Sequence, residues 1–313
     1  MAIRMPEGRA LKILGFTDTH IDGNAGCAEW TMRLVRETIA AEKPDMVVFV
    51  GDNITGADNY ERTRAFTDMM SGLGVPWCPV LGNHEGDNAG SISRTAMMEI
   101  FRSSPCCAIP DSIEMHGNGR SDYTVDVKNA GGDNCFRLIF MDGGAYMTED
   151  EVRRYSPDYT GTAYAFLGAE QIVWYRAQVK DCGCKSIVFC HIPLPEFKEG
   201  GIISGMNREG ICCPPYNSGM FEAMAEEGST VAFVSGHDHI NDSHALHRGI
   251  RLVYNRMSGL SSYNVISKGI SDRLIQGCTV YNVCEDGHVE YGDIYYEDRY
   301  PNYREEILKI IKK

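Results

Sequence analysis

The sequence has no apolar run long enough to cross a membrane. A membrane-spanning helix needs about 20 consecutive apolar residues, and no apolar run among the 313 residues approaches that length. The first ten residues, Met1 to Ala10, also lack the apolar segment of a signal peptide. We therefore expect no membrane partner and a cytoplasmic location, although a secretory signal removed before Met1 would leave no trace here.

Basic residues are scarce relative to acidic ones. The chain has 30 Lys and Arg against 43 Asp and Glu, which gives a formal net charge of −13 at pH 7. Binding along nucleic acid requires clustered Lys and Arg, so we expect no nucleic-acid partner. A small pocket for one phosphate, particularly one that contains metal cations, is compatible with this charge.

Paired C-x-x-C zinc motifs are absent, although the chain has 12 cysteines. Several cysteines lie inside apolar runs, as Cys190 does, where a free thiol behaves as a small apolar residue. The close clusters are Cys182-Gly183-Cys184 and two Cys-Cys pairs. This pattern favours reduced thiols over a disulfide framework.

The first part of the chain alternates apolar runs with amphipathic segments. Apolar runs at 11–16, 46–50 and 75–81 predict buried strands, and the patterns at 27–42 and 60–73 predict helices between them. Strands that are apolar throughout and are connected by helices are typical of parallel βαβ units. We therefore predict an α/β fold.

The rest of the chain continues with strands and helices and has no internal repeat or linker. The patterns predict a hairpin at 123–127 and 136–141, strands at 186–190, 231–235, 250–254, 278–283 and 289–295, and helices at 94–102, 167–181, 220–227 and 304–311. Residues 197–218 are rich in glycine and are predicted to be irregular. We expect a single domain over residues 1–313, with its core at about 11–296.

Side chains of metal-binding type follow five of the predicted strands. They are Asp18, His20, Asp52, Asn83, His84, His191, His237 and His239. Taken alone, each is more often a turn residue or a helix cap than a ligand. Because ligands of α/β sheets bind beyond the carboxyl ends of the strands, their recurrence at these ends indicates one shared site.

The spacing and type of these residues indicate a metal site. Residues two apart on an extended chain point to the same side, so Asp18 with His20, and His237 with His239, can each address one centre. Nitrogen and oxygen ligands without a thiolate favour Mn, Fe or Zn. Seven ligands are too many for one ion, but they suit two ions that share a bridging carboxylate and leave positions open for water and substrate.

In this order, the segments resemble the five sequence blocks of the calcineurin-like metallophosphoesterase superfamily. The blocks are Asp18-Thr19-His20, Gly51-Asp52-Asn53, Gly82-Asn83-His84-Glu85, His191 and Gly236-His237-Asp238-His239. The resemblance covers Leu11 to Leu260 and is greatest with the purple-acid-phosphatase-related branch, which includes plant and fungal proteins. It implies a four-layer α/β/β/α sandwich, in which two mixed β-sheets are flanked by helices.

The resemblance also implies a role for each of these residues. Asp18, His20 and His239 would hold the first metal, and Asn83, His191 and His237 the second. Asp52 would bridge the two ions. His84 would be the catalytic residue that contacts the substrate phosphate and protonates the leaving oxygen. Glu85 would either support these ligands or begin a helix.

One position departs from the family pattern. Purple acid phosphatases have a tyrosine ligand three residues after the bridging aspartate, and related protein phosphatases have an acidic residue there that orients the catalytic histidine. This chain has Thr55 at that position. The partner of His84 is therefore open, and Asp142, which also follows a predicted strand, is a candidate.

The resemblance implies a dinuclear-metal phosphoesterase that hydrolyses a phosphate ester by attack of metal-bound hydroxide. A phosphomonoesterase acting on a small-molecule phosphate ester or a phosphoprotein is favoured. The alternatives are a phosphodiesterase of the same fold with a nucleotide or phospholipid-headgroup substrate, and a non-enzymatic metal-binding interaction scaffold. The loops 87–120, 142–166 and 196–218 would surround the substrate, but we expect Tyr159 and Tyr164 to belong to a packed loop.

Overall fold

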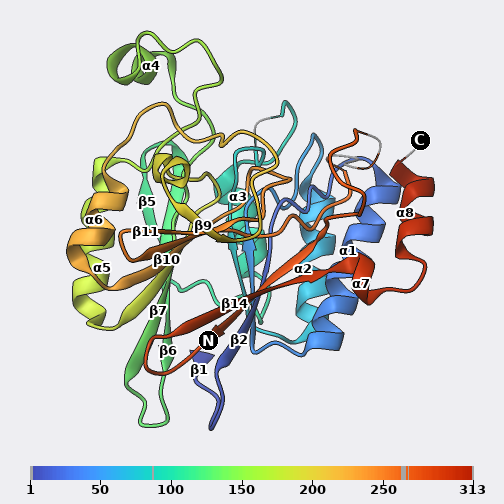
Figure 1. Ribbon diagram of the computed structural model, residues 1–313, viewed down its shortest axis with the longest axis horizontal. Helices are drawn as coiled ribbons and strands as arrows, with labels where there is room; N and C mark the ends of the chain where they lie inside the picture. The colour runs from blue at the N-terminus through green and yellow to red at the C-terminus, as the bar shows by residue number, and fades with distance from the viewer. Residues whose placement is uncertain (1–2, 87, 262–265, 267, 312–313) are drawn as a thin grey trace.

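Two β-sheets pack face to face, with helices on their outer sides (Figure 1). The structure is a computed structural model that describes residues 3–86, 88–261, 266 and 268–311. Both sheets contain parallel and antiparallel pairs, so the predicted four-layer α/β/β/α sandwich of two mixed sheets is confirmed. Among the described residues, no helix combines the length and apolar character that crossing a membrane requires.

The five-stranded sheet contains the three parallel strands predicted near the start of the chain. Its order is β14 (Val289–Tyr295), β13 (Gly277–Val283), β2 (Leu11–Phe16), β3 (Met46–Val50) and β4 (Trp77–Val80). The helices on this side are α1 (Ala25–Glu42), α2 (Tyr60–Leu73), α3 (Arg94–Arg102), α7 (Tyr296–Arg299) and α8 (Tyr303–Ile311). Apolar strands of this kind can be buried on both faces because helices cover one face and the second sheet covers the other.

The second sheet has nine strands. In order, they are β1 (Ile3–Arg4), β6 (Arg120–Lys128), β7 (Asn134–Phe140), β8 (Lys185–Phe189), β10 (Thr230–Ser235), β12 (Ile250–Tyr254), β11 (His244–His247) and β9 (Gly201–Ser204), with β5 (Glu114–His116) paired to β6. Helices α5 (Ala169–Cys182) and α6 (Met220–Glu227) pack on its outer face.

Several short elements were not predicted. They are β1, β5, β9, β11, α7 and α4 (Glu149–Tyr155), together with two single 3₁₀ turns at Gly117–Gly119 and Pro195–Lys198. The strand β9 lies in the segment that was predicted to be irregular. Helix α4 has no buried residue, and it is stabilised at its start by a capping box between Thr148 and Glu151. Elements this short or this exposed leave no apolar periodicity in the sequence.

The prediction that all thiols are reduced is wrong at one pair. Cys182 and Cys184 form a disulfide, while the other ten cysteines are free. Gly183 ends α5 with φ +64° and turns the chain, which places the two Cα atoms 5.3 Å apart. That separation lies within the range that a disulfide requires.

The core between the five-stranded sheet and its helices contains a cluster of aromatic side chains. Phe49 on β3 is fully buried, and its ring lies 5.5 Å from Phe16, 4.9 Å from Phe66 and 5.9 Å from Trp77, measured between ring centroids. Edge-to-face aromatic pairs at this spacing add to the stabilisation that burial provides. The cluster therefore fixes α2 against β3 and β4, the strands that are followed by Asp52 and Asn83.

Replacing Phe49 with alanine should reduce the free energy of unfolding by about 3–5 kcal/mol, because it removes a fully buried ring and leaves a cavity. Urea denaturation followed by circular dichroism measures this change. Val173→Ala is the control, since Val173 is 69% exposed and its loss should change stability by about 0.5 kcal/mol or less. A loss below about 1 kcal/mol for Phe49→Ala would contradict the assignment of the core.

Candidate metal centre

The loops that follow β2, β3, β8 and β10 are joined by hydrogen bonds, among them one from the Gly236 N–H to the His191 carbonyl at 3.1 Å. The Asp18 N–H donates to the Gly51 carbonyl at 3.0 Å, and the His20 N–H donates to the Asp52 carbonyl at 2.9 Å. Across the sheets, the His237 N–H donates to Asp18 Oδ2 at 3.1 Å. The strand ends of the two sheets therefore meet at one place, as the sequence predicted.

Four of the predicted ligands form one compact cluster. One ligand atom from each of Asp18, His20, Asp52 and His239 lies within 4.8 Å of the other three. The His20 Nε2 atom is 3.6 Å from Asp52 Oδ2 and 3.0 Å from His239 Nε2. The His239 Nε2 atom is 3.3 Å from Asp18 Oδ1. Two carboxylates and two imidazoles at these distances form a donor set that suits a divalent cation.

The other three predicted ligands lie beside this cluster. The His191 Nε2 atom is 3.3 Å from Asp52 Oδ2, and the His191 and His237 rings are 5.2 Å apart between centroids. The loop that carries Asn83 is attached through its next residue, since the His84 N–H donates to Asp52 Oδ1 at 2.9 Å. Asp52 thus contacts both halves of the site.

Five donor atoms of these ligands are buried and accept or donate no hydrogen bond within the part of the chain that the structure describes. They are Asp18 Oδ1, Asp52 Oδ2, Asn83 Oδ1, His191 Nε2 and His237 Nε2. Four of these residues also have a second polar side-chain atom that forms a hydrogen bond within the protein: Asp18, Asp52, Asn83 and His191. Buried polar atoms are normally satisfied, so orphan atoms that gather at one centre fit a bound metal.

The backbone at this centre is strained. Four residues here have positive φ values: +50° for Asp18, +41° for His20, +49° for Asp52 and +75° for His237. These values lie in the left-handed region that residues other than glycine rarely adopt. Gly82 is needed for space, because a Cβ there would lie 2.2 Å from Asp52 Oδ1. Strain of this kind is concentrated at functional sites.

Glu85 connects two of the loops. Its carboxylate accepts the N–H groups of Gly82 at 2.7 Å and Asp52 at 3.1 Å, and also that of Asn53. Burial, together with the negative charge of Asp52, raises the pKa of Glu85 to about 7. Glu85 therefore supports the ligands, which is one of the two roles that the sequence left open.

The charges of the cluster offset one another in part. Burial alone would lower the pKa of His191, but the carboxylates of Asp52 and Asp18 raise it to about 10. Burial and the nearby charge of His191 lower the pKa of His237 to about 3. Burial alone would raise the pKa of Asp18, but His191 and His239 lower it to about 2. A cation at this centre would replace the charge that His191 otherwise provides.

Comparison with known families identifies the fold and the motifs together. The family model described as calcineurin-like phosphoesterase matches residues 11–241 of the chain. The chain belongs to this family. The matched range contains all eight residues that the sequence singled out at the strand ends.

The curated relatives include phosphatases from plants and yeast. "Probable inactive purple acid phosphatase 14" from Arabidopsis thaliana is 29% identical over 79% of this chain and 66% of its own length. "Phosphatase DCR2" from Saccharomyces cerevisiae is 30% identical over 68% of this chain and 39% of its own length. The chain therefore spans just under two thirds of the plant relative and well under half of the yeast protein.

A solved structure of similar fold is a dimetal phosphatase from Danio rerio, with a TM-score of 0.60 and 16% identity over 92% of this chain and 99% of that chain. GAP50 of Plasmodium, described as the anchor in the inner membrane complex, has a TM-score of 0.52 and 12% identity over 91% of this chain and 84% of that chain. At these identities the likeness shows the fold of the family alone.

His84 lies at the edge of the calcineurin-like site, and Asp142, the sequence-based candidate for its partner, is paired with Arg94. The His84 ring is 5.7 Å from the His20 ring and is partly exposed. Asp142 Oδ1 instead bonds to Arg94 and accepts the Gly144 N–H. The reason is that Arg94 lies between the two loops, where its Nη1 also donates to the Gly82 carbonyl at 2.6 Å.

Two tyrosines at the site were not predicted to be there. Tyr164 was expected in a packed loop, but its ring lies 4.4 Å from the His237 ring, edge to face. Tyr146 accepts a hydrogen bond from Asn83 Nδ2 at 3.3 Å through its hydroxyl. Tyr159, also expected in a packed loop, is 42% exposed. No sequence pattern shows which tyrosines of this long loop return to the strand ends.

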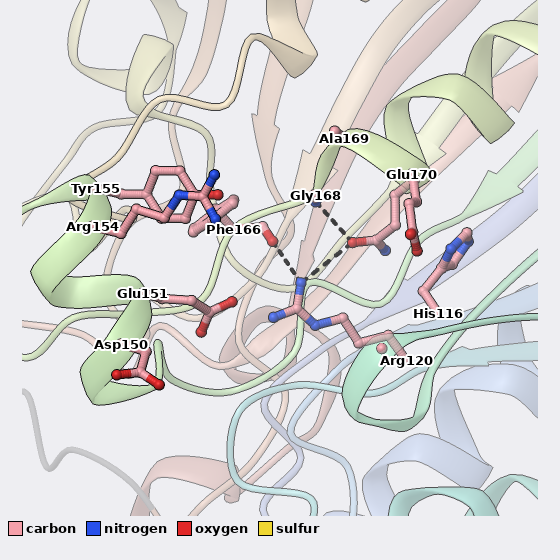
Figure 2. A pocket seen from close by; sticks show the side chains of 12 residues that line it. His116, Arg120, Asp150, Glu151, Arg154, Tyr155, Phe166, Gly168, Ala169 and Glu170 are labelled. Carbon is pink, nitrogen blue, oxygen red and sulfur yellow. Dashed lines mark hydrogen bonds between the residues drawn. The ribbon is translucent and has the colours of Figure 1, made fainter.

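A cavity of about 450 Å³ lies next to this loop (Figure 2). Its lining contains none of the seven predicted ligands and combines basic with acidic side chains, among them Arg120, Arg154 and Glu170. The candidate metal centre therefore lies at the orphan donor atoms and not in this cavity.

Replacing Glu85 with glutamine should weaken metal binding by about 10- to 100-fold, the usual effect of removing a group that orients ligands. The glutamine keeps the size of the side chain, but its NH₂ group cannot accept the backbone N–H groups that the carboxylate accepts. Calorimetric titration with Mn²⁺ measures the change. Glu61→Gln, at an exposed position on α2, is the control, and equal affinities for the two variants would refute the role of Glu85.

Proposed function

We propose that the chain is a dinuclear-metal phosphoesterase, and that phosphomonoesters are its favoured substrates. The observation that carries the proposal is the set of five orphan donor atoms buried at the strand ends. Membership of the calcineurin-like family supports it independently. The relatives named as phosphatases favour a monoester substrate. The alternative is a diester substrate with a nucleotide or a phospholipid headgroup.

In this proposal, the seven side chains divide between two ions. Asp18, His20 and His239 form the first set, consistent with their compact cluster. His191, His237 and Asn83 would form the second, and Asp52, which lies within 3.6 Å of both His20 and His191, would be shared by the two sets. The mixed oxygen and nitrogen donors suit manganese, iron or zinc.

The protein's own groups position the reaction. Two cations, when bound, supply Lewis acidity to the phosphate and lower the pKa of water. The carboxylates and imidazoles hold these ions, and their own second atoms are anchored: Asp18 Oδ2 by Thr17 Oγ1 at 2.9 Å and His191 Nδ1 by the Val50 carbonyl at 2.8 Å. Groups fixed before the substrate arrives need no reorganisation during the reaction.

His84 is the proposed general acid. Its ring is beside His20 but is partly exposed, so it can meet a phosphate ester that enters from solvent. Its backbone N–H is held by Asp52 Oδ1 at 2.9 Å, which fixes the residue relative to the proposed bridging ligand. From this position the imidazole can donate a proton to the departing oxygen.

A second candidate is a non-enzymatic metal-binding scaffold that recognises a partner. The printed name of the Arabidopsis relative, which describes that protein as probably inactive, favours it. The complete set of ligand side chains and His84 in this chain favours an enzyme instead. The two candidates differ in one measurable respect, since both bind metal but only the enzyme turns over a phosphate ester.

Asp52→Asn should abolish hydrolysis of p-nitrophenyl phosphate measured with added Mn²⁺, because a neutral amide cannot bridge two cations as a carboxylate does. Chelation of the wild-type protein should have the same effect, and readdition of Mn²⁺ should reverse it. Turnover by Asp52→Asn would exclude the proposed mechanism. A wild-type protein that binds Mn²⁺ without any turnover would favour the scaffold.

His84→Ala should reduce turnover by about 10²- to 10⁴-fold, the range for loss of a general acid, and leave metal content unchanged. Asn83→Ala should instead weaken metal binding by at least about tenfold. Elemental analysis and steady-state kinetics measure both effects. His288→Ala, on an exposed turn, is the control, and equal metal loss in the first two variants would show that their roles are not divided in this way.

A further inference from the structure

A short antiparallel ribbon lies beside the proposed metal centre. It is formed by residues 145–147 and 163–165, where the Met147 N–H donates to the Ala163 carbonyl at 2.8 Å and the Ala165 N–H donates to the Ala145 carbonyl at 3.1 Å. These bonds place Tyr146 and Tyr164 opposite each other as a β-bridge. The backbone positions of both tyrosines are therefore fixed.

Arg120 holds Phe166, the residue that directly follows the ribbon (Figure 2). The Arg120 side chain is only 8% exposed, and its Nη1 donates to the Phe166 carbonyl at 2.7 Å and to Gln171 Oε1 at 3.4 Å. Its guanidinium also fills the space beside Gly144, where a Cβ would lie 2.7 Å from Nε. Arg120 thus supports the segments that enter and leave the ribbon.

The two tyrosines continue the proposed metal site outward. The Tyr164 ring stands at 85° to the ring of His237, with centroids 4.4 Å apart. The Tyr146 ring is stacked on Tyr164 at 5.8 Å and 28°. The hydroxyl of Tyr146 accepts a hydrogen bond from Asn83 Nδ2 at 3.3 Å, so each tyrosine touches a different proposed ligand of the second metal.

Tyr146 is both fixed and exposed. Its backbone is held by the ribbon, its hydroxyl by Asn83 and one side of its ring by Tyr164, yet 40% of its surface faces solvent. A ring held in place before binding loses little conformational entropy when another ring packs against it. An exposed aromatic surface therefore lies directly beside Asn83, a proposed metal ligand.

We propose that Tyr146 and Tyr164 form an aromatic platform that selects phosphate esters with a planar aromatic leaving group over esters with an aliphatic one. This inference rests on the proposed phosphoesterase function. Offset stacking or edge-to-face contact with Tyr146 would stabilise a bound aryl group. The hydroxyl of Tyr146 has a separate role, since it orients the Asn83 amide so that Oδ1 faces the metal centre.

Two phosphonates that cannot be hydrolysed test the platform in the manganese-loaded protein. Phenylphosphonate carries a planar ring, and butylphosphonate carries a flexible chain on the same anionic group. Calorimetry should show tighter binding of phenylphosphonate by the wild-type protein. Tyr146→Leu should reduce the ratio of the two affinities by about three- to tenfold, whereas Tyr146→Phe should retain the ratio because it keeps the ring.

Tyr159→Leu is the matched control, because Tyr159 belongs to the same loop and is 42% exposed, and among the described residues its hydroxyl bonds locally, to the Thr162 carbonyl at 3.3 Å. Its affinity ratio should equal that of the wild type. Metal content and the thermal midpoint of each variant identify any loss of the centre or of folding, and Tyr164→Leu supplies a second variant that should also reduce the ratio.

The inference is overturned if the wild-type protein binds both phosphonates equally, or if Tyr146→Leu and Tyr164→Leu weaken both to the same extent. Its failure is distinct from failure of the proposed function. A protein that hydrolyses p-nitrophenyl phosphate without aryl selectivity refutes only the platform. A protein without turnover that still loses phenylphosphonate selectivity in Tyr146→Leu refutes the enzyme but supports the platform.

Discussion

The geometry of the centre depends on the hydrogen bonds that the Glu85 carboxylate accepts. This carboxylate accepts backbone N–H groups from both the loop after β3 and the loop after β4. The first loop carries Asp52, the proposed bridge, and the second carries Asn83 and His84. Asp52 then reaches the other sheet through His191, while Asp18 does so through the His237 N–H. Without this buried acceptor, the loops would have three unsatisfied N–H groups and no fixed separation.

The sequence predicted the parts of this protein that repeat a simple physical pattern. Continuous apolar runs located the strands, and polar residues at their carboxyl ends located the site. Short strands such as β1 and β9 could not be predicted, because two to four residues carry no periodicity. Glu85 was ambiguous because its function is to join backbones that are adjacent only in space. The position of Tyr146 beside Asn83 depends on a ribbon supported by Arg120, and the pairing of Asp142 with Arg94 depends on the path of a third segment.

Family membership and local geometry support different parts of the functional argument. The family model and the fold establish a calcineurin-like phosphoesterase scaffold. The orphan atoms of this chain address the chemistry directly, because buried carboxylate, amide and imidazole atoms that form no hydrogen bond among the described residues, two of them facing each other at 3.3 Å, suit a cation between them. The printed name of the plant relative, which describes that protein as probably inactive, favours a metal-binding scaffold instead. Thr55 replaces the tyrosine ligand of purple acid phosphatases and the acidic residue of related protein phosphatases, while the seven proposed ligand positions are all filled.

The left-handed backbone at Asp18, His20, Asp52 and His237 has a consequence for how this protein could change over time. Glycine or asparagine adopts that conformation more easily than these residues do. Substitutions that relax the strain would therefore be expected to make the metal-free protein more resistant to heat while they destroy the centre, a trade between stability and activity. Selection for thermal stability alone would replace these four residues early. If a lineage or a directed-evolution library keeps them, the reason is therefore the ligand that they bind.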